Sequence, residues 1–186
     1  MNKRLLCLMN EEKDKDMPRV IYECSALCRC SFNNCKNRVV QCGSDVPLQV
    51  FHDENKGWSV RTMSRIRKGG FVCEYVGEVI TSVEAVKNRS ENSDYMFILY
   101  HQTEGLTYLL DSKTYGNVAR FINHCCVGNL VPIPVLLGKH ADHRFPRIAF
   151  FAKHDILPGQ EVTYNYGDMF NVDQCHCLKP ECRFKN

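Results

Sequence analysis

The sequence has no long hydrophobic run, no internal repeat and no low-complexity tract. No apolar stretch approaches the ~20 residues that a membrane-spanning helix needs, so we expect no membrane partner. The basic and apolar start, Met1 to Met9, is too short for a secretory signal, and no small-residue cleavage site follows it. Hydrophobic residues make up 44% of the 186 residues, which predicts one globular domain with small appendages.

The chain also lacks a strong charge of either sign. Its formal charge is +3, and a zinc ion held by four thiolates would lower that charge by two. Autonomous DNA-binding domains carry a strong basic patch, and no basic recognition helix follows the cysteines. We therefore expect no direct sequence-specific nucleic-acid binding. No G-x-G-x-x-G stretch occurs either, so the usual dinucleotide-binding loop is absent.

Short strands dominate the central part of the chain. Runs rich in Val, Ile, Phe and Tyr alternate with Gly, Pro, Asn or Asp, which is typical of strands in small sheets. One short helix is expected to begin at a capping box, Thr81 to Glu84, and to end at about Asn88. Turns are predicted at Arg67 to Gly70 and at Leu157 to Gln160. The predicted strands are Leu48–Phe51, Trp58–Arg61, Phe71–Ile80, Tyr95–Tyr100, Leu106–Leu110, Leu130–Leu137 and Ile148–Ala152. This pattern predicts a mostly β fold.

Seven of the twelve cysteines lie in two tight clusters. Disulfides in a secreted protein are one interpretation, but thiols one residue apart converge readily on one metal, so we favour zinc and an intracellular compartment. A closed tetrahedral site needs four ligands, and the C-terminal cluster has three; a loose tail with reduced thiols is its alternative. For the N-terminal cluster, free thiols or one ordinary zinc site remain open. The clusters contain Cys24, Cys28, Cys30 and Cys35, and Cys175, Cys177 and Cys182.

Two further strings lie between the clusters, Arg120-Phe121-Ile122-Asn123-His124-Cys125-Cys126 and Tyr164-Asn165-Tyr166-Gly167-Asp168. Together with Gly57-Trp58 and Cys73-Glu74-Tyr75-Val76-Gly77-Glu78, they resemble the signatures of the SET-domain protein-lysine methyltransferases. The resemblance runs from about Tyr22 to Phe184 and is closest to the SUV39/euchromatic branch, which methylates lysine 9 of histone H3. It implies a SET fold of small β-sheets with a knot-like C-terminal segment. It also implies a partial pre-SET segment at 1–44, a SET domain at 45–169 and a post-SET zinc tail at 170–186.

The resemblance implies methyl transfer from S-adenosylmethionine to a lysine side chain, with zinc in a structural role only. It makes Cys126 the fourth ligand of the C-terminal zinc site. Burial of the lysine in an aromatic channel would lower its pKa and so favour the reactive neutral amine. Without this context, a lone tryptophan is by default a core residue and a tyrosine in Tyr-Gly a structural one. The implied catalytic residues are Tyr166, Tyr75 and Tyr164, and the implied cofactor-binding residues are Lys56, Gly57, Trp58, Tyr95, Arg120, Phe121, Asn123 and His124.

The implied partners are the histone H3 tail and chromatin, in the nucleus and on chromosomes. Tyr164 stands where the family carries Phe or Tyr, and its hydroxyl restricts the space for further methyl groups, so we expect mainly monomethylation. The departures from the family pattern at Ser59 and at Val127-Gly128 motivate an alternative, a catalytically weakened binding or scaffold module in a chromatin complex. The usual Gly-Trp-Gly turn ends in Ser59, the usual Asp-Pro-Asn reads Val127-Gly128-Asn129, and Asn165 replaces the common Asp.

Overall fold

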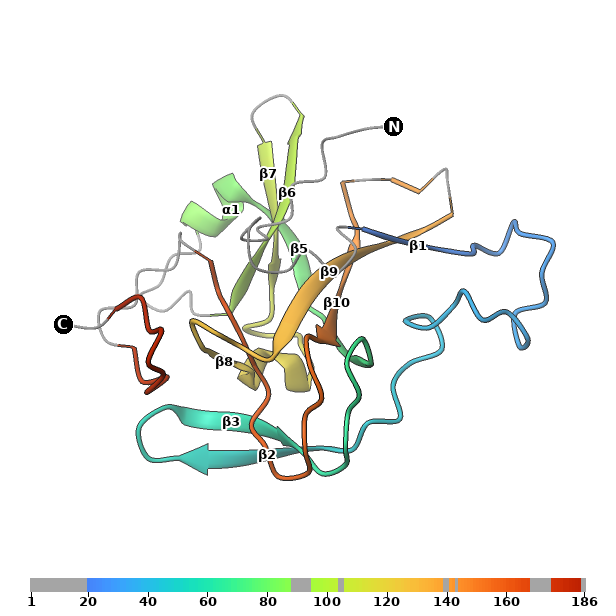
Figure 1. Ribbon diagram of the computed structural model, residues 1–186. Coiled ribbons are helices and arrows are strands. Elements are labelled where there is room, and N and C mark those ends of the chain that lie inside the picture. The colour runs from blue at the N-terminus through green and yellow to red at the C-terminus, as the bar shows by residue number, and fades with distance from the viewer. Residues whose placement is uncertain are drawn as a thin grey trace.

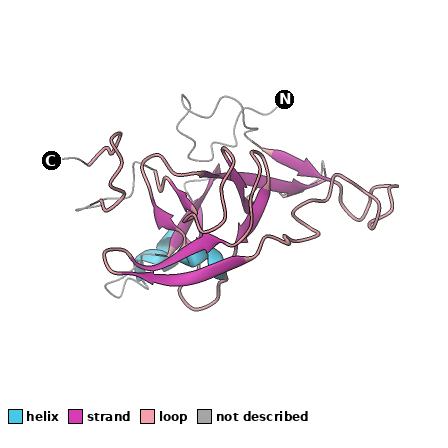
Figure 2. Ribbon diagram, turned by 60° about the horizontal axis from the view of Figure 1, so that its bottom comes forward, coloured by secondary structure: helices cyan, strands magenta, loops and turns pink. Residues whose placement is uncertain are grey.

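The computed structural model of the protein describes residues 20–87, 95–103, 106–138, 141–142, 144–167 and 175–184. Within these ranges the strands form four small sheets rather than one continuous sheet, as Figure 1 shows. Strands and loops account for nearly all of the chain and helices for little of it (Figure 2). Among the described residues, no helix is long and apolar enough to cross a membrane. The predicted mostly β fold is therefore confirmed.

The largest sheet has the strand order β1-β9-β10-β4. Strand β1 runs parallel to β9, whereas β9, β10 and β4 are antiparallel neighbours. Strands β9 and β10 are nearly continuous apolar runs and are buried along almost their whole length, as expected for strands covered on both faces. The strand bounds are β1 Ile21–Glu23, β4 Phe71–Tyr75, β9 Leu130–Leu137 and β10 Arg147–Ala152.

Strand β9 carries two prolines, which are normally excluded from the interior of a sheet because they cannot donate to a neighbour. Pro132 and Pro134 lie opposite Phe150 and Ile148 of β10. On its other side, β9 pairs with β1 only from Val135 onward. Within the described residues, the prolines thus occupy the stretch of β9 that has no second partner strand, and this limits β1 to three residues.

The other sheets surround this one. Strands β2 and β3 form a hairpin, β6 and β7 form a second hairpin that also pairs with β5, and β8 pairs in parallel with β11. A short α-helix, α1, and a 3-10 helix, η1, complete the described elements. Their bounds are β2 Leu48–Asp53, β3 Gly57–Thr62, β5 Glu78–Thr81, α1 Ser82–Lys87, β6 Met96–Thr103, β7 Leu106–Asp111, η1 Val118–Phe121, β8 Asn123–His124 and β11 Thr163–Tyr164.

The local predictions are confirmed with one correction. The capping box forms, because the backbone N–H of Thr81 donates to the Glu84 carboxylate at 2.8 Å and the N–H of Glu84 donates to the Thr81 hydroxyl at 3.2 Å. The run predicted as one strand at 71–80 is wrong, since it divides into β4 and β5. A Cβ on Gly77 would lie 2.6 Å from the carbonyl oxygen of Asp111, so the chain bends where that carbonyl approaches it. The predicted helix end at Asn88 lies outside the described residues.

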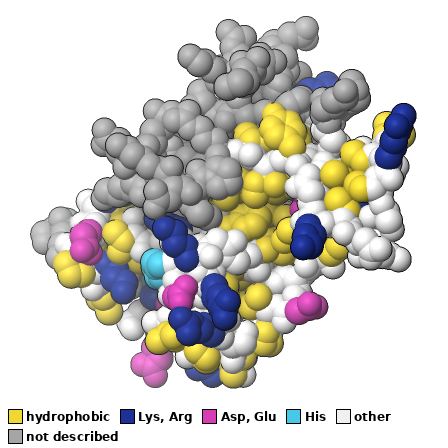
Figure 3. All heavy atoms as spheres, turned by 45° about the vertical axis from the view of Figure 1, so that its right-hand side comes forward, with side chains coloured by type: hydrophobic (Ala, Val, Ile, Leu, Met, Phe, Trp, Pro, Cys, Tyr) yellow, Lys and Arg dark blue, Asp and Glu magenta, His cyan; other side chains and the backbone are white. Residues whose placement is uncertain are grey.

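Residues 24–43 form an extended, mostly irregular arm beside the sheets (Figures 1 and 2). The buried carboxylate of Glu23 fixes the base of this arm: it accepts hydrogen bonds from the backbone N–H groups of Val40 at 2.6 Å and Gln41 at 3.2 Å. On the face shown in Figure 3, basic side chains are scattered among acidic and hydrophobic ones and do not gather in one patch. This distribution agrees with the weak net charge of the sequence.

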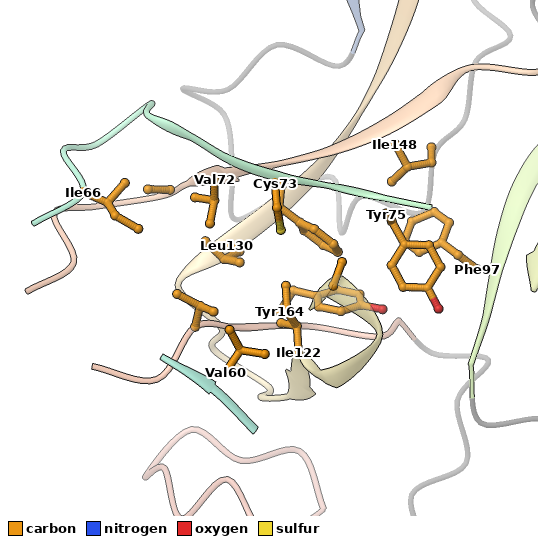
Figure 4. Close-up of a cluster of buried hydrophobic side chains, with 14 of the residues drawn as sticks. Val60, Ile66, Val72, Cys73, Tyr75, Phe97, Ile122, Leu130, Ile148 and Tyr164 are labelled. Carbon is orange, nitrogen blue, oxygen red and sulfur yellow. The ribbon is translucent and has the colours of Figure 1, made fainter. Parts of the chain in front are cut away.

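The main core takes buried residues from β3, β4, β6, β7, η1, β9, β10 and β11. It contains Val60, Ile66, Phe150 and Ile156 together with two of the tyrosines singled out from the sequence. Figure 4 shows the side chains of Tyr75 and Tyr164 within this cluster. Two candidate site residues are therefore also core residues.

Candidate active site

The site begins where the two signature strings meet. Strand β8 pairs with β11 in parallel, which brings the residues after β11 against those of β8. The backbone N–H of Tyr166 donates to Nδ1 of His124 at 3.1 Å, and the Tyr166 hydroxyl donates to the carbonyl oxygen of Ile122 at 2.7 Å. The rings of His124 and Tyr166 lie 5.3 Å apart, edge to face. Two strings about forty residues apart in sequence thus form one compact unit.

The imidazole of His124 is neutral in this arrangement. Its burial and the nearby positive charge of Arg183 lower its pKa from 6.5 to about 4. A neutral ring with a free lone pair on Nδ1 can accept from the Tyr166 N–H, which leaves the proton on Nε2. Nε2 lies 3.3 Å from Sγ of Cys126. His124 therefore links the Tyr166 backbone to the cysteine cluster.

Aromatic rings form a continuous row behind Tyr166. The ring centroids of Tyr166 and Tyr164 are 4.6 Å apart, those of Tyr164 and Phe97 are 6.4 Å apart, and those of Phe97 and Tyr75 are 5.4 Å apart. Phe150 packs against Tyr164 at 4.7 Å. Such tilted and edge-to-face pairs are the favourable geometries for aromatic rings, so the row is held rigidly.

Burial keeps the hydroxyls of Tyr75 and Tyr164 protonated. It raises the pKa of Tyr75 and raises that of Tyr164 well above 10.0. The Tyr75 hydroxyl donates to the carbonyl oxygen of Tyr95 at 2.7 Å. Figure 4 shows the hydroxyls of Tyr75 and Tyr164 on the same side of the cluster. The row thus offers neutral polar groups in an otherwise apolar setting.

Arg120 lies beside this row. Its guanidinium carbon is 4.3 Å from the ring centroid of Tyr95 and 5.4 Å from that of Phe121, which are cation–π distances. Its Nε is buried and, within the part of the chain that the structure describes, has no hydrogen-bond partner. An orphaned buried N–H is unusual, and at this place it is suited to the acceptor of a ligand.

Asn123 lies at the centre of a polar network. Its Nδ2 is 2.7 Å from the Ser59 hydroxyl, 3.3 Å from the Trp58 carbonyl oxygen and 3.3 Å from Oε1 of Glu161. The other carboxylate oxygen of Glu161 pairs with Nζ of Lys56 at 2.5 Å. The structure therefore brings Lys56, Trp58 and Asn123 together.

Sequence reasoning missed two members of this network. Ser59 appeared only as a departure from a glycine, and Glu161 did not appear at all. Glu161 stands 105 residues after Lys56, so no local spacing indicates the pair. The side chain of Trp58 is 57% exposed and touches the ring of His52 at 5.4 Å. The core role that a lone tryptophan has by default is thus excluded for Trp58.

The C-terminal cysteines converge with Cys126. The sulfur atoms of Cys126, Cys175, Cys177 and Cys182 all lie within 4.8 Å of one another. Four thiolates at ~2.3 Å from a tetrahedral zinc ion are about 3.8 Å apart, and the Sγ of Cys126 is 3.9 Å from those of both Cys175 and Cys182. These positions fit a closed zinc site.

The tail that carries these cysteines also touches the site directly. Arg183 donates through Nη2 to the side-chain oxygen of Asn165 at 2.9 Å. The ring of Phe184 lies 6.0 Å from that of His124. Asp168, the last residue of the signature string, lies outside the described residues. A metal ion bound by the tail would therefore help to hold Asn165 and His124 of the site in place.

The arm holds a second, less complete cysteine group. The sulfur atoms of Cys24, Cys30 and Cys35 lie within 4.8 Å of one another, and Cys28 is not a member of this set. Nη2 of the buried Arg38 is 3.7 Å from Sγ of Cys30 and brings a positive charge to the thiols. All described cysteines are free, so the described residues form no disulfide.

Comparison with known proteins agrees with this geometry. Residues 57–167 match the family model described as SET domain. Human histone-lysine N-methyltransferase EHMT1 is 44% identical over 171 residues, which cover 89% of this chain and 13% of EHMT1. The chain thus spans only a small part of that relative.

Solved structures give the same result. Arabidopsis thaliana SUVH6 in complex with SAM superposes with a TM-score of 0.79 at 37% identity, over 89% of this chain and 38% of that one. KRYPTONITE in complex with mCHH DNA, H3(1-15) peptide and SAH superposes with a TM-score of 0.72 at 34% identity, over 89% of this chain and 34% of that one. The family model covers more than half of the residues, and the chain belongs to the SET-domain family.

Proposed function

We propose that this chain is an S-adenosylmethionine-dependent histone-lysine N-methyltransferase, with lysine 9 of histone H3 as its substrate and monomethyl-lysine as its main product. The observation that carries the proposal is the junction of β8 and β11, where the Tyr166 hydroxyl lies 2.7 Å from the carbonyl oxygen of Ile122. That contact sets Tyr166 of the second string beside Asn123 and His124 of the first. A hydroxyl held there can align a reacting amine, and alignment is the main demand of an in-line displacement.

The residues present fit the methyl donor. Arg120 has a buried N–H without a partner, Trp58 presents an exposed ring at a glycine turn, and Asn123 has its amide held in place by neighbours. These groups offer a donor, an apolar cover and a fixed amide, which suit the polar atoms and the flat adenine ring of the methyl donor. When bound, S-adenosylmethionine supplies a methyl group activated by a sulfonium. We propose Lys56, Gly57, Tyr95, Phe121 and His124 as the remaining cofactor-binding residues.

The aromatic row would prepare the lysine. A free lysine has a pKa of about 10.4, so it arrives as an ammonium, which cannot attack. Burial among Tyr75, Tyr164 and Tyr166 disfavours the charged form and lowers that pKa. The proton leaves toward solvent, and the neutral amine is then held between these rings, where burial keeps the hydroxyls of Tyr75 and Tyr164 protonated. We propose these three tyrosines as the catalytic residues.

The Tyr164 hydroxyl sets the proposed product. The side chain is 7% exposed and packs against Phe97, Phe150 and Tyr166. Its oxygen can anchor a water molecule and restrict the space for further methyl groups.

The choice of histone H3 as the substrate rests on similar proteins. EHMT1 is a histone-lysine N-methyltransferase, SUVH6 was solved in complex with SAM, and KRYPTONITE was solved with an H3(1-15) peptide. Chromatin as the partner and a nuclear, chromosomal location follow from that substrate.

Zinc has a structural role in this proposal. Cys126, Cys175, Cys177 and Cys182 would hold one ion in the tail at 170–186. Cys24, Cys30 and Cys35, with Cys28 beside them, would hold one in the arm, which belongs to the partial pre-SET segment at 1–44. The SET domain at 45–169 lies between these two zinc-bound ends.

Transfer of label from the methyl donor to histone H3 peptides tests the function. Tyr166→Phe removes one hydroxyl and is expected to lower kcat by roughly a hundredfold, as removal of a preorganised polar contact does. Tyr115→Phe is the matched control, because Tyr115 is 65% exposed and should leave the rate unchanged. An H3 peptide with arginine in place of lysine 9 should accept no label.

The same assay distinguishes an active methyltransferase from the scaffold alternative. Incorporation that is lost in Tyr166→Phe supports catalysis. Binding of the methyl donor without incorporation into any histone peptide would contradict the proposal and favour a binding module instead.

A further inference from the structure

We propose that Ser59 is a positioning residue for the methyl donor: its hydroxyl holds the Asn123 amide so that the Asn123 side-chain oxygen is presented to the cofactor as a hydrogen-bond acceptor. The inference rests on the proposed function and adds a residue specific to this chain, since the family turn is usually Gly-Trp-Gly.

The chemistry of its neighbours fixes the orientation of the Asn123 amide. The Glu161 carboxylate and the Trp58 carbonyl oxygen, each 3.3 Å from one end of the amide, can only accept hydrogen bonds. The end that faces them must therefore be the NH2 group. The oxygen, Oδ1, then points away from the network.

Ser59 supplies the shortest contact to that NH2 group. Its hydroxyl lies 3.3 Å from the carbonyl oxygen of Gly57, to which it donates, and this leaves a lone pair for Nδ2 of Asn123 at 2.7 Å. The residue is fully buried at 0% exposure, so water cannot replace the hydroxyl. The contact ties β3 to β8, the two strands that carry four of the proposed cofactor-binding residues.

The amide oxygen is left available. Within the described residues, Oδ1 of Asn123 accepts no hydrogen bond, although Nδ2 lies within hydrogen-bond distance of three acceptors. Oδ1 is also absent from the buried unsatisfied atoms of the described chain, so a ligand can reach it. S-adenosylmethionine carries N–H and O–H donors, and a fixed acceptor binds such a donor without losing rotational freedom first.

A double-mutant cycle separates this role from a general packing role. Binding of S-adenosylhomocysteine is measured by calorimetry for the unmodified chain, Ser59→Ala, Asn123→Ala and the double variant. Loss of one hydrogen bond predicts about three- to tenfold weaker binding for Ser59→Ala. Because Ser59 acts through Asn123, the same change should alter binding by less than about 1.5-fold in the Asn123→Ala background. Ser44→Ala, an exposed serine, should not alter binding.

Kinetics give a second readout. In Ser59→Ala, KM for the methyl donor should rise about three- to tenfold while kcat stays within about twofold, since only binding contacts change. Ser59→Gly, which restores the family turn, should give the same result and serves if the alanine variant does not fold.

Three outcomes would overturn the inference. Unchanged binding in both Ser59 variants would do so, and so would an equal penalty with and without Asn123, which indicates packing alone. In both cases the proposed function survives, because the unmodified chain binds and reacts. Absence of any binding by the unmodified chain would instead refute the proposed function, and the inference with it.

Discussion

The ion pair between Arg147 on β10 and Glu74 on β4 provides a quantitative test of the structure. Two parallel hydrogen bonds join the side chains, from Nε to Oε1 at 2.8 Å and from Nη2 to Oε2 at 2.5 Å. The same Nη2 lies 3.5 Å from the carbonyl oxygen of Val40 in the arm. Glu74 directly precedes Tyr75, so this pair connects the arm to the strand that carries a proposed catalytic residue.

The burial of the two side chains determines how much this ion pair is expected to contribute to stability. The side chains of Arg147 and Glu74 are only 31% and 22% exposed, and hydrogen bonds between charged groups in such surroundings contribute ~1.5–3 kcal/mol. The chain holds a matched control: Arg65 and Asp155 approach equally closely, at 2.5 Å, but are 61% and 42% exposed. Pairs as exposed as this one contribute only ~0.2–1 kcal/mol.

Two double-mutant cycles in urea denaturation measure the difference. The first uses Arg147→Met, Glu74→Gln and both, and the second uses Arg65→Met, Asp155→Asn and both. We expect a coupling energy of ~2 kcal/mol in the first cycle and less than ~1 kcal/mol in the second. Arg147→Met alone should lower Tm by about 4–8 °C, since each kcal/mol shifts Tm by about 2–4 °C at this chain length.

Equal coupling energies in the two cycles would refute the reasoning, because distance alone would then determine the contribution. Activity gives a further check. Glu74→Gln should lower kcat by several fold through displacement of Tyr75, whereas Asp155→Asn should leave kcat unchanged. A loss of activity in both variants would point to general destabilisation.

Three further perturbations have defined outcomes. Tyr164→Phe should shift the products from monomethyl-lysine toward dimethyl-lysine in mass spectrometry of the peptide, and abundant trimethyl-lysine from the unmodified chain would contradict the proposal. Removal of zinc by a chelator should abolish methyl transfer while the thermal transition of the sheets remains, because the tail lies outside the core; Cys182→Ser should give the same result. Burial raises the pKa of Cys73 from 9.0 to about 12, so the unfolded state loses its thiol proton first. This contribution to stability is fully present below pH 9 and is lost between about pH 9 and 12, and Cys73→Val should remove it from urea midpoints measured across that range.

The strands that pack a long apolar face could be predicted from the sequence, and the shortest ones could not. Strands β9 and β10 are apolar runs of ordinary length, and both were expected. The two-residue strands β8 and β11 have no pattern of their own. They exist because Thr163 and Tyr164 pair with residues forty positions earlier. Strand β1 likewise depends on a partner more than one hundred residues away.

The residues of the site also divide into those that the sequence could predict and those that it could not. The signature strings indicated Asn123, His124 and Tyr166, because a resemblance of whole strings carries residue identities across directly. It gave no information about the partner of Asn123 in a turn that departs from the family. Ser59 and Glu161 become visible only when β3, β8 and the segment before β11 lie together. Contacts between distant segments are thus the part that local sequence patterns do not encode.

The small size of the sheets explains why the proposed site is difficult to alter without an effect on stability. A sheet of two strands is at best marginally stable alone, and two of the four sheets have only two strands. All four sheets contribute to the main core, and the proposed channel lies at their junction. Tyr75 and Tyr164 belong to the main core cluster and to the aromatic row at once. Truncation of either to alanine would leave a cavity and cost ~3–5 kcal/mol, and the resulting loss of activity would carry no mechanistic information. Phenylalanine preserves the ring contacts and removes only the oxygen. The roles of these tyrosines can therefore be separated from their packing by hydroxyl removal, and not by truncation.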